Sequence, residues 1–367
     1  MLLGVPKEIK TEEYRVAMVP AGVREVVAAG HQVRVEAGAG LGAGISDEAY
    51  ALAGAQLTDA AGAWEAQMVV KVKEPLPSEY GFFRPGLLLY TYLHLAAQPE
   101  LTRRLVADRV QAVAYETIQL PDGSLPLLVP MSEVAGRMAV QAGAHYLERP
   151  QGGRGVLLGG VPGVRPGRVT ILGAGVVGHA ALKMALGLRA RVTAIDRCQP
   201  RLSYLDDLYG GRVTTLYSLP DTVAAACADS DLVIGAVLVA GAKAPQLVSE
   251  EMVRSMEQGT VIVDVAIDQG GCVATMRPTT HSDPVYTMHG VIHYGVANIP
   301  GAVSRTSTFA LTNATLHYAL VLAQGGLAAA RQDPALALGV NVAGGHIVHP
   351  AVAQAFGEAA TPLSQAL

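Results

Sequence analysis

Three glycines near the middle of the chain have the spacing of a nucleotide-binding turn. Gly173 and Gly175 follow the apolar run Val169–Leu172, and Gly178 belongs to the helical pattern of apolar residues that starts at Val177. In a βαβ unit the first glycine permits a tight turn, the second lets backbone N–H groups approach a pyrophosphate, and the third lets the helix lie close to the strand. The spacing therefore predicts a dinucleotide site at the start of this helix.

An acidic residue at the end of the next strand bears on the choice of dinucleotide. Asp196 ends the run Arg191–Asp196, about 20 residues after Gly173, the separation at which a carboxylate accepts hydrogen bonds from the adenosine ribose. The same carboxylate would repel a 2′-phosphate, so NAD is favoured. Arg197, the next residue, is able to meet a phosphate and keeps NADP open as the alternative.

Two side chains that can take part in chemistry lie nearer the N-terminus. Lys73 belongs to the carboxyl end of a strand-like run that starts at Met68, and His94 ends the run Leu87–His94. Because the carboxyl ends of parallel strands meet at one edge of a sheet, both residues are expected at a common crevice. The alternatives are a solvated lysine and a histidine that bonds to a neighbouring loop.

The composition favours a globular protein that acts on small molecules. Half of the residues are hydrophobic, only 16% are charged, and the net charge is −4 with no block of Lys or Arg, which argues against a nucleic-acid or membrane surface. So little charge suggests an oligomer. Three scattered cysteines and the absence of a signal-peptide pattern lead us to expect a cytoplasmic protein with no disulfide framework and no metal.

The order of expected strands and helices predicts two doubly wound α/β domains. Residues 127–304 are expected to form a Rossmann NAD-binding domain, and residues 1–126 with 305–367 a discontinuous, Rossmann-like substrate domain. A long helix from Met131, capped by Ser132, marks the boundary. A helix over Ser307–Leu322 leads back to the first domain, and closing helices follow over Ala335–Leu367.

Several separated motifs together resemble the L-alanine dehydrogenases, whose wider family includes the NAD-binding subunit of transhydrogenase. The resemblance extends from Met1 to about Leu338 and is weak over Asn341–Leu367. The motifs are Glu13-Tyr-Arg15-Val-Ala, Lys71-Val-Lys73-Glu-Pro, Leu93-His94-Leu-Ala-Ala, Pro130-Met131-Ser132-Glu-Val-Ala-Gly-Arg, Gln151-Gly-Gly-Arg-Gly-Val-Leu, Gly160-Val-Pro-Gly-Val, Ile234 to Pro245, Asp264-Val-Ala-Ile-Asp268-Gln-Gly-Gly and Thr306 to Thr315.

The resemblance implies reversible, NAD-dependent oxidative deamination of L-alanine to pyruvate and ammonia by a homohexamer. It implies that Arg15 and Lys73 bind the substrate carboxylate and carbonyl oxygen, and that His94 and Asp268 are the acid/base pair. It also places Met131 and Asn298 at the substrate. The residue types suit these roles, since a guanidinium holds a carboxylate at two points and histidine exchanges protons near neutral pH.

The resemblance further implies a set of residues around NAD. They are Ser132, Gly173, Gly175, Val176, Gly178, Asp196, Arg201, Ser218, Val237, Leu238, Val265, Ala266, Ile267, Asp268, Arg277, Val296, Ala297, Asn298 and Ile299. Two departures from the family pattern, Ile299 in place of methionine and Ala240 in place of proline, concern the packing of the nucleotide and not the chemistry.

Three other functions are compatible with parts of this pattern. A transhydrogenase NAD subunit would keep Asp196 but need neither Lys73 nor His94, and its Arg-Ala-Gln loop is not found after Met131. A lysine-forming saccharopine dehydrogenase would need a different loop near Asn298. A nucleotide sensor without catalysis is the third alternative, because fold alone does not establish an activity.

Overall fold

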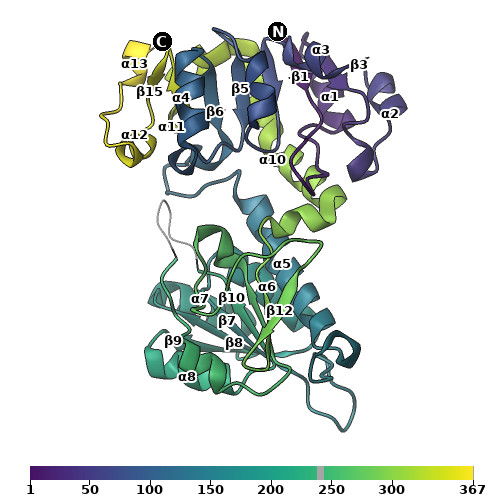
Figure 1. Ribbon diagram of the computed structural model, residues 1–367, viewed down its shortest axis with the longest axis vertical. Coiled ribbons are helices and arrows are strands. Elements are labelled where there is room, and N and C mark those ends of the chain that lie inside the picture. The colour runs from purple at the N-terminus through teal and green to yellow at the C-terminus, as the bar shows by residue number, and fades with distance from the viewer. Residues whose placement is uncertain (238–243, 367) are drawn as a thin grey trace. The chain divides into compact units, whose positions relative to one another are not determined.

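The chain divides into two units, with limits between Met131 and Ser132 and again between Ala302 and Val303 (Figure 1). Unit 1 consists of Met1–Met131 and Val303–Leu367, and unit 2 of Ser132–Ala302. The computed structural model describes residues 1–237 and 244–366. The domain limits expected from the sequence, between residues 126 and 127 and between residues 304 and 305, stay a prediction.

A largely parallel sheet forms the centre of unit 1. Its order over the described residues is β15-β14-β6-β5-β4-β1-β2-β3, and only β14 and β15 run antiparallel to their neighbours β6 and β14. The strands are β1 (Leu2–Val5), β2 (Gln32–Glu36), β3 (Gln56–Thr58), β4 (Met68–Val70), β5 (Leu88–Thr91), β6 (Gln111–Ala114), β14 (Val340–Ala343) and β15 (His346–Ile347).

Helices connect these strands and cover the sheet. Helix α3 packs on β1 and β2, and α1 packs on β2 and α10 (Figure 1). The helices are α1 (Pro20–Ala28), α2 (Asp47–Leu52), α3 (Ala60–Trp64), α4 (Pro99–Ala107), α10 (Ser304–Gly325), α11 (Pro334–Gly339), α12 (Pro350–Ala355) and α13 (Leu363–Ala366), with α5 (Val129–Tyr146) at the limit of the unit.

Unit 2 contains a second doubly wound sheet. Its order within the described part of the chain is β12-β13-β11-β10-β7-β8-β9, with only the edge strand β12 antiparallel. The strands are β7 (Arg168–Leu172), β8 (Arg191–Asp196), β9 (Val213–Tyr217), β10 (Leu232–Gly235), β11 (Val261–Asp264), β12 (Val285–Met288) and β13 (Val291–Tyr294), and the helices are α6 (Val176–Gly187), α7 (Gln199–Tyr209), α8 (Pro220–Ala228) and α9 (Glu250–Arg254).

The central strands of unit 2 are buried on both faces. Ile171 and Ile234 belong to the hydrophobic cluster on one side of the sheet, whereas their neighbours Leu172 and Val233 belong to the cluster on the other side. Successive side chains of a strand point to opposite faces, so this alternation requires apolar residues at every position. The predicted fold class, two α/β units with mostly parallel sheets, is confirmed.

The glycine turn between β7 and α6 is tightly packed. Gly173 has φ +100°, and a Cβ on it would lie 2.6 Å from the carbonyl oxygen of Ala236. A Cβ on Gly178 would lie 1.8 Å from the oxygen of Gly173. No heavy atom lies within 4 Å of the corresponding position on Gly175. Gly173 and Gly178 are therefore required by packing, and Gly175 borders open space.

Two expectations about secondary structure are wrong. Helix α5 begins at Val129, so Ser132 lies inside its first turn and is not its cap. The segment from Ala335 is not purely helical, because β14 and β15 add two antiparallel strands to the edge of the first sheet beside β6. Edge pairing depends on a partner strand far away in the sequence, and local periodicity does not reveal it.

Over residues 1–237 and 244–366, no helix combines the length and the apolar character needed to cross a bilayer.

Replacing Gly178 by alanine is expected to destabilise the protein. The new methyl group would overlap the Gly173 carbonyl, so we expect a loss of about 3 kcal/mol in unfolding free energy, measured by denaturant unfolding. Gly187→Ala is the matched control at the other end of α6, where no atom lies within 4 Å of the added Cβ. That variant is expected to be neutral or stabilised by up to about 1 kcal/mol. Equal losses in both variants would contradict the packing role of Gly178.

Candidate functional site

The predicted substrate residues of unit 1 follow neighbouring parallel strands. Arg15 follows β1, Lys73 follows β4 and His94 follows β5, and the sheet places these strands in the order β5-β4-β1. The hydroxyl of Thr91, at the end of β5, donates to the carbonyl oxygen of Lys73 at 3.0 Å. The expectation that Lys73 and His94 belong to one edge of the sheet agrees with this arrangement.

Arg15 is buried and held in one orientation by a carboxylate. Its Nε and Nη2 atoms donate to the two oxygens of Glu13 at 2.7 and 2.6 Å, and Nη1 contacts the sulfur of Met131 at 3.0 Å. Burial lowers the pKa of Arg15, but the hydrogen bonds and charge of Glu13 outweigh it, and the pKa is raised. The structure thus brings together two residues, Arg15 and Met131, that the family resemblance assigned to substrate.

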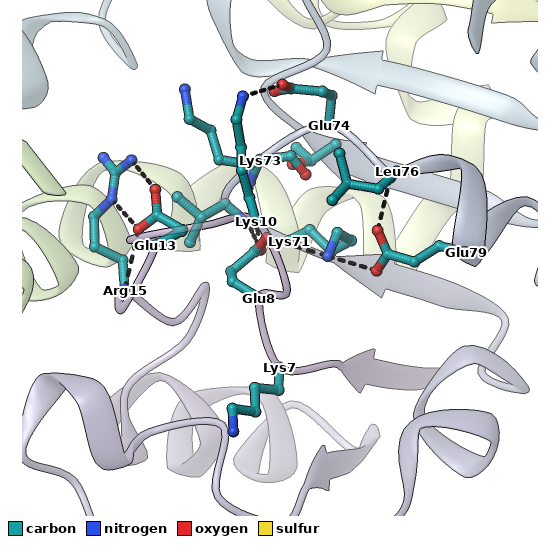
Figure 2. Close-up of polar contacts among 12 residues, drawn as sticks. Lys7, Glu8, Lys10, Glu13, Arg15, Lys71, Lys73, Glu74, Leu76 and Glu79 are labelled. Carbon is teal, nitrogen blue, oxygen red and sulfur yellow. Dashed lines mark hydrogen bonds and ion pairs between the residues drawn. The ribbon is translucent and has the colours of Figure 1, made fainter. Parts of the chain in front are cut away.

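The amine of Lys73 has no bonded partner in the described part of the chain. Its side chain is half-buried, and Nζ forms no hydrogen bond or ion pair with any residue that the structure describes. Figure 2 shows this amine apart from the neighbouring pair of Lys10 and Glu74, which are 2.5 Å apart. Burial, and next the charge of Arg15, lower the pKa of Lys73. The neutral amine is therefore easier to reach here than in water.

His94 has a strained backbone conformation in the segment that follows β5. It adopts the left-handed conformation with φ 50°, its backbone N–H donates to Glu116 at 2.5 Å, and its ring stacks on Tyr92 with centroids 5.9 Å apart. Nδ1 lies 3.9 Å from a Glu116 oxygen, and 45% of the side chain is exposed. A non-glycine residue in this conformation is uncommon and indicates a local constraint.

In unit 2 Asp196 and Arg201 fix the turn that follows Gly173. One Asp196 oxygen accepts from the Ala174 N–H at 2.6 Å and the other from Cys198 N–H at 2.7 Å. Arg201 Nε donates to the carbonyl oxygen of Ala174 at 2.6 Å. Both backbone polar groups of Ala174 are thus held, next to Gly175, the residue that precedes α6. The N–H of Ser218 donates to the backbone oxygen of Asp196 at 3.0 Å, so Ser218 lies beside the same turn.

A histidine that the sequence did not single out supports the same turn. His179 Nδ1 lies 2.9 Å from Arg201 Nη2, and Nε2 lies 2.8 Å from the Tyr209 hydroxyl. Because a guanidinium only donates, Nδ1 must accept and Nε2 must carry the proton. Burial and then the charge of Arg201 lower the pKa of His179 to about 4, so the ring is neutral near pH 7.

Asp264 holds the loop that carries Asp268. Its carboxylate is fully buried and accepts from the N–H groups of Ala266 at 3.0 Å, Cys272 at 2.8 Å and Val273 at 3.2 Å. Burial raises the pKa of Asp264, although these donors act in the opposite direction. Val265–Gln269 form a short 3-10 helix on which Asp268 is exposed, while Ala266 and Ile267 are buried.

The last predicted cofactor residues lie around β13. Asn298 has φ 60°, and its carbonyl oxygen accepts from His281 at 3.2 Å. Arg277 stacks on Tyr286, and its segment pairs with residues 295–297 through Thr279.

The other assigned residues lie in several elements. Val176 starts α6, Ser132 lies in α5 and Val237 follows β10. Val296 and Ile299 are buried, Ala297 is exposed, and Leu238, like Ala240, lies outside the described residues.

Within the residues that the structure describes, no group of three or more His, Cys, Asp or Glu side chains is arranged to hold a metal ion.

Both halves of the sequence match one protein family. Residues 4–135 match the Alanine dehydrogenase/PNT N-terminal domain, and residues 139–350 match the Alanine dehydrogenase/PNT C-terminal domain. This chain belongs to the alanine dehydrogenase/PNT family. Membership was predicted from the separated motifs and is confirmed.

Individual members of the alanine dehydrogenase/PNT family are similar over the whole chain. Proteins named alanine dehydrogenase from Methanococcus maripaludis and Bacillus subtilis are each 56% identical, covering 100% of this chain and 100% and 98% of the relative. A solved structure titled L-alanine dehydrogenase has 57% identity and a TM-score of 0.95 over 97% of this chain and 99% of its own. The transhydrogenase structure from Sinorhizobium meliloti has 26% identity and a TM-score of 0.83, covering 96% and 100%.

The sequence pattern did not reveal the carboxylates that surround the cations of this family member. Glu8, Glu13 and Glu79 are buried acids in contact with Arg15 or Lys71, and Glu116 binds the backbone at His94. Glu8 and Glu13 belong to the polar segment that follows β1. These carboxylates could have been predicted from the acidic residues near Arg15 and Lys71 in the sequence, because buried cations need carboxylate partners.

Asp264→Asn is expected to destabilise unit 2. An amide has one acceptor oxygen, so its NH₂ group would face an N–H donor that the carboxylate now satisfies, and we expect a loss of about 1–3 kcal/mol in unfolding free energy. Thermal or denaturant unfolding measures it. Asp268→Asn, at an exposed position in the same loop, should keep the stability of the unchanged protein. An unaffected Asp264→Asn variant would show that the loop does not depend on these hydrogen bonds.

Proposed function

We propose that this chain is an NAD-dependent L-alanine dehydrogenase, which converts L-alanine, NAD⁺ and water to pyruvate, ammonium, NADH and a proton in a reversible reaction. One observation carries the proposal: two cationic side chains, Arg15 and Lys73, follow neighbouring strands of unit 1, the first fixed by Glu13 and the second without a partner among the described residues. A small 2-oxo or 2-amino acid has a carboxylate and a second polar atom to match them. Relatives named alanine dehydrogenase with 54–58% identity support the choice of substrate.

Arg15 and Lys73 orient the substrate in this proposal. The guanidinium of Arg15, already held by Glu13, binds the carboxylate, and the contact of Arg15 with Met131 puts that side chain at the substrate as well. Lys73 donates to the atom that becomes the carbonyl oxygen of pyruvate. The substrate would thereby become the partner that the Lys73 amine lacks.

The proton steps are assigned to His94 and Asp268. Bound NAD would supply the acceptor for the hydride of the α-carbon, which would leave the substrate as an iminium. Water must then add to the iminium and ammonia must leave, so a group is needed that takes up and returns protons near neutral pH. His94 is half-exposed and of the right type. Asp268, also exposed, would stabilise the positive charge or orient water, and Asn298 would contact the substrate.

The nucleotide is assigned to the turns of unit 2. Open space at Gly175, beside the N-terminus of α6, fits a pyrophosphate, whereas a side chain there would occupy it. Each Asp196 oxygen accepts one backbone hydrogen bond and has a second lone pair for a ribose hydroxyl, which favours NAD over NADP. We also assign to NAD the remaining residues that the family resemblance places around it, from Ser132 to Ile299.

The proposal also covers the localisation and the assembly of the protein. We propose a cytoplasmic homo-oligomer, a hexamer by resemblance to the family, with L-alanine, pyruvate and ammonia as its partners and NAD as its cofactor. A transhydrogenase-like subunit or a nucleotide sensor would bind NAD without acting on L-alanine.

The first experiment is to mix the purified protein with NAD and L-alanine and follow NADH by absorbance. Glycine, L-serine and L-lysine replace L-alanine in parallel samples, and NADP replaces NAD. NADH formation that is fastest with L-alanine and NAD is expected. Binding of NADH without turnover of any amino acid would instead favour a transhydrogenase-like subunit or a sensor.

His94→Ala is expected to lower kcat by about 100-fold or more, because the proton transfers lose their acid and base. NADH affinity, measured by fluorescence titration, should stay unchanged. His346→Ala removes an exposed histidine of the same unit and serves as the control with the original activity. A His94→Ala variant with the kcat of the unchanged protein would exclude His94 as the acid/base.

A further inference from the structure

A buried lysine next to the proposed substrate residues has no role in the mechanism so far. Lys71 has no exposed surface, and its Nζ lies 3.2 Å from Glu8 Oε2 and 2.9 Å from Glu79 Oε1. The ring of Trp64 approaches the same amine, with its centroid at 5.9 Å. We refer to Glu8, Lys71 and Glu79 as the buried triad (Figure 2).

The two carboxylates of the triad also bind backbone of the segment that carries Lys73. Glu8 Oε1 accepts from the N–H groups of Val72 at 2.6 Å and Lys73 at 3.3 Å. Glu79 Oε2 accepts from the Leu76 N–H at 2.8 Å. Glu8 therefore fixes the peptide of Lys73 itself, and Glu79 fixes the segment further along the chain.

This backbone attachment matters because no residue that the structure describes fixes the Lys73 side chain at its other end. Its Nζ makes no hydrogen bond or ion pair with the described residues, so the position of the amine depends on where its own Cα is held. Lys71 in turn holds Glu8. It is a fixed cation, since burial lowers its pKa but the two carboxylates outweigh burial and raise it.

We propose that Glu8 is a positioning residue for Lys73, and that Lys71 is the counter-ion that keeps Glu8 in place. The proposal rests on the proposed function, in which Lys73 binds the oxygen of the oxo acid. Glu8 does not touch the substrate. It sets the orientation of the peptide from which the Lys73 side chain extends.

Glu8→Gln tests this with little change in volume. Both oxygens of Glu8 face donors, Lys71 on one side and two N–H groups on the other, so an amide leaves one side facing its own NH₂ group. We expect kcat/KM for pyruvate in reductive amination to fall by about tenfold or more, since misplacing a reacting group by even 1 Å can cost about 100-fold. KM for NADH should stay unchanged.

Glu79→Gln is the matched control. It disturbs the same lysine in the same way, because Glu79 also faces Lys71 with one oxygen and an N–H with the other, but that N–H belongs to Leu76. Its kcat/KM for pyruvate should stay within about threefold of the unchanged protein. Glu65→Gln, which removes an exposed ion pair with Arg34 in the same unit, should have no effect.

The outcomes separate the two proposals. Without NADH formation from L-alanine and NAD by the unchanged protein, the proposed function fails and the role of Glu8 fails with it. With activity present, equal losses in Glu8→Gln and Glu79→Gln would overturn the positioning role, and so would a Glu8→Gln variant within twofold of the unchanged protein.

A conservative variant covers the case in which Glu8→Gln does not fold. Glu8→Asp keeps the charge and both acceptor oxygens but shortens the side chain by one methylene. We expect it to fold and to lose kcat/KM for pyruvate, to a smaller extent than Glu8→Gln where both fold, again with KM for NADH unchanged. Unchanged kcat/KM for pyruvate in a folded Glu8→Asp variant would overturn the proposal.

Discussion

The segments that follow β1 and β4 in unit 1 depend on one constraint, which is that their buried positive charges need carboxylate partners. Arg15 and Lys71 are buried, and removing an ion from water costs several kcal/mol unless close partners replace the solvent. Glu13 is that partner for Arg15, and Glu8 and Glu79 are the partners for Lys71. The pair of Glu8 and Lys71 joins the segment after β1 to the segment after β4, so these charges are satisfied only when the sheet brings the two segments together.

Steric limits have the corresponding role in unit 2. The closeness of α6 to β7 leaves no room for a side chain on Gly178, and Gly173 needs a left-handed backbone. The helix N-terminus, with its positive dipole end, is thereby fixed beside the end of a buried strand. Asp196 and Arg201 then bind the N–H and the carbonyl oxygen of Ala174, so protein groups hold the backbone of this turn.

The sequence predicted those parts of the fold and site that depend on local pattern. Apolar runs with glycine or charged residues at their ends placed Lys73 and the turn at Gly173 correctly after the strands β4 and β7. The start of α5 was missed because an apolar segment without a capping side chain gives no signal. The triad was missed for a different reason: Glu8 and Lys71 are 63 residues apart in the sequence, and only the pairing of β1 with β4 makes them neighbours.

Lys71 and Lys73 show how one short motif serves structure and chemistry separately. The amine of Lys71 is fully buried between two carboxylates and near a ring, so solvent and ligands do not reach it. The amine of Lys73 is half-buried with its pKa lowered and no bonded partner in the described chain, an arrangement that costs stability unless a ligand completes it. A fully satisfied lysine is therefore the sign of a structural role here, and the unsatisfied one two residues later is the sign of a binding role.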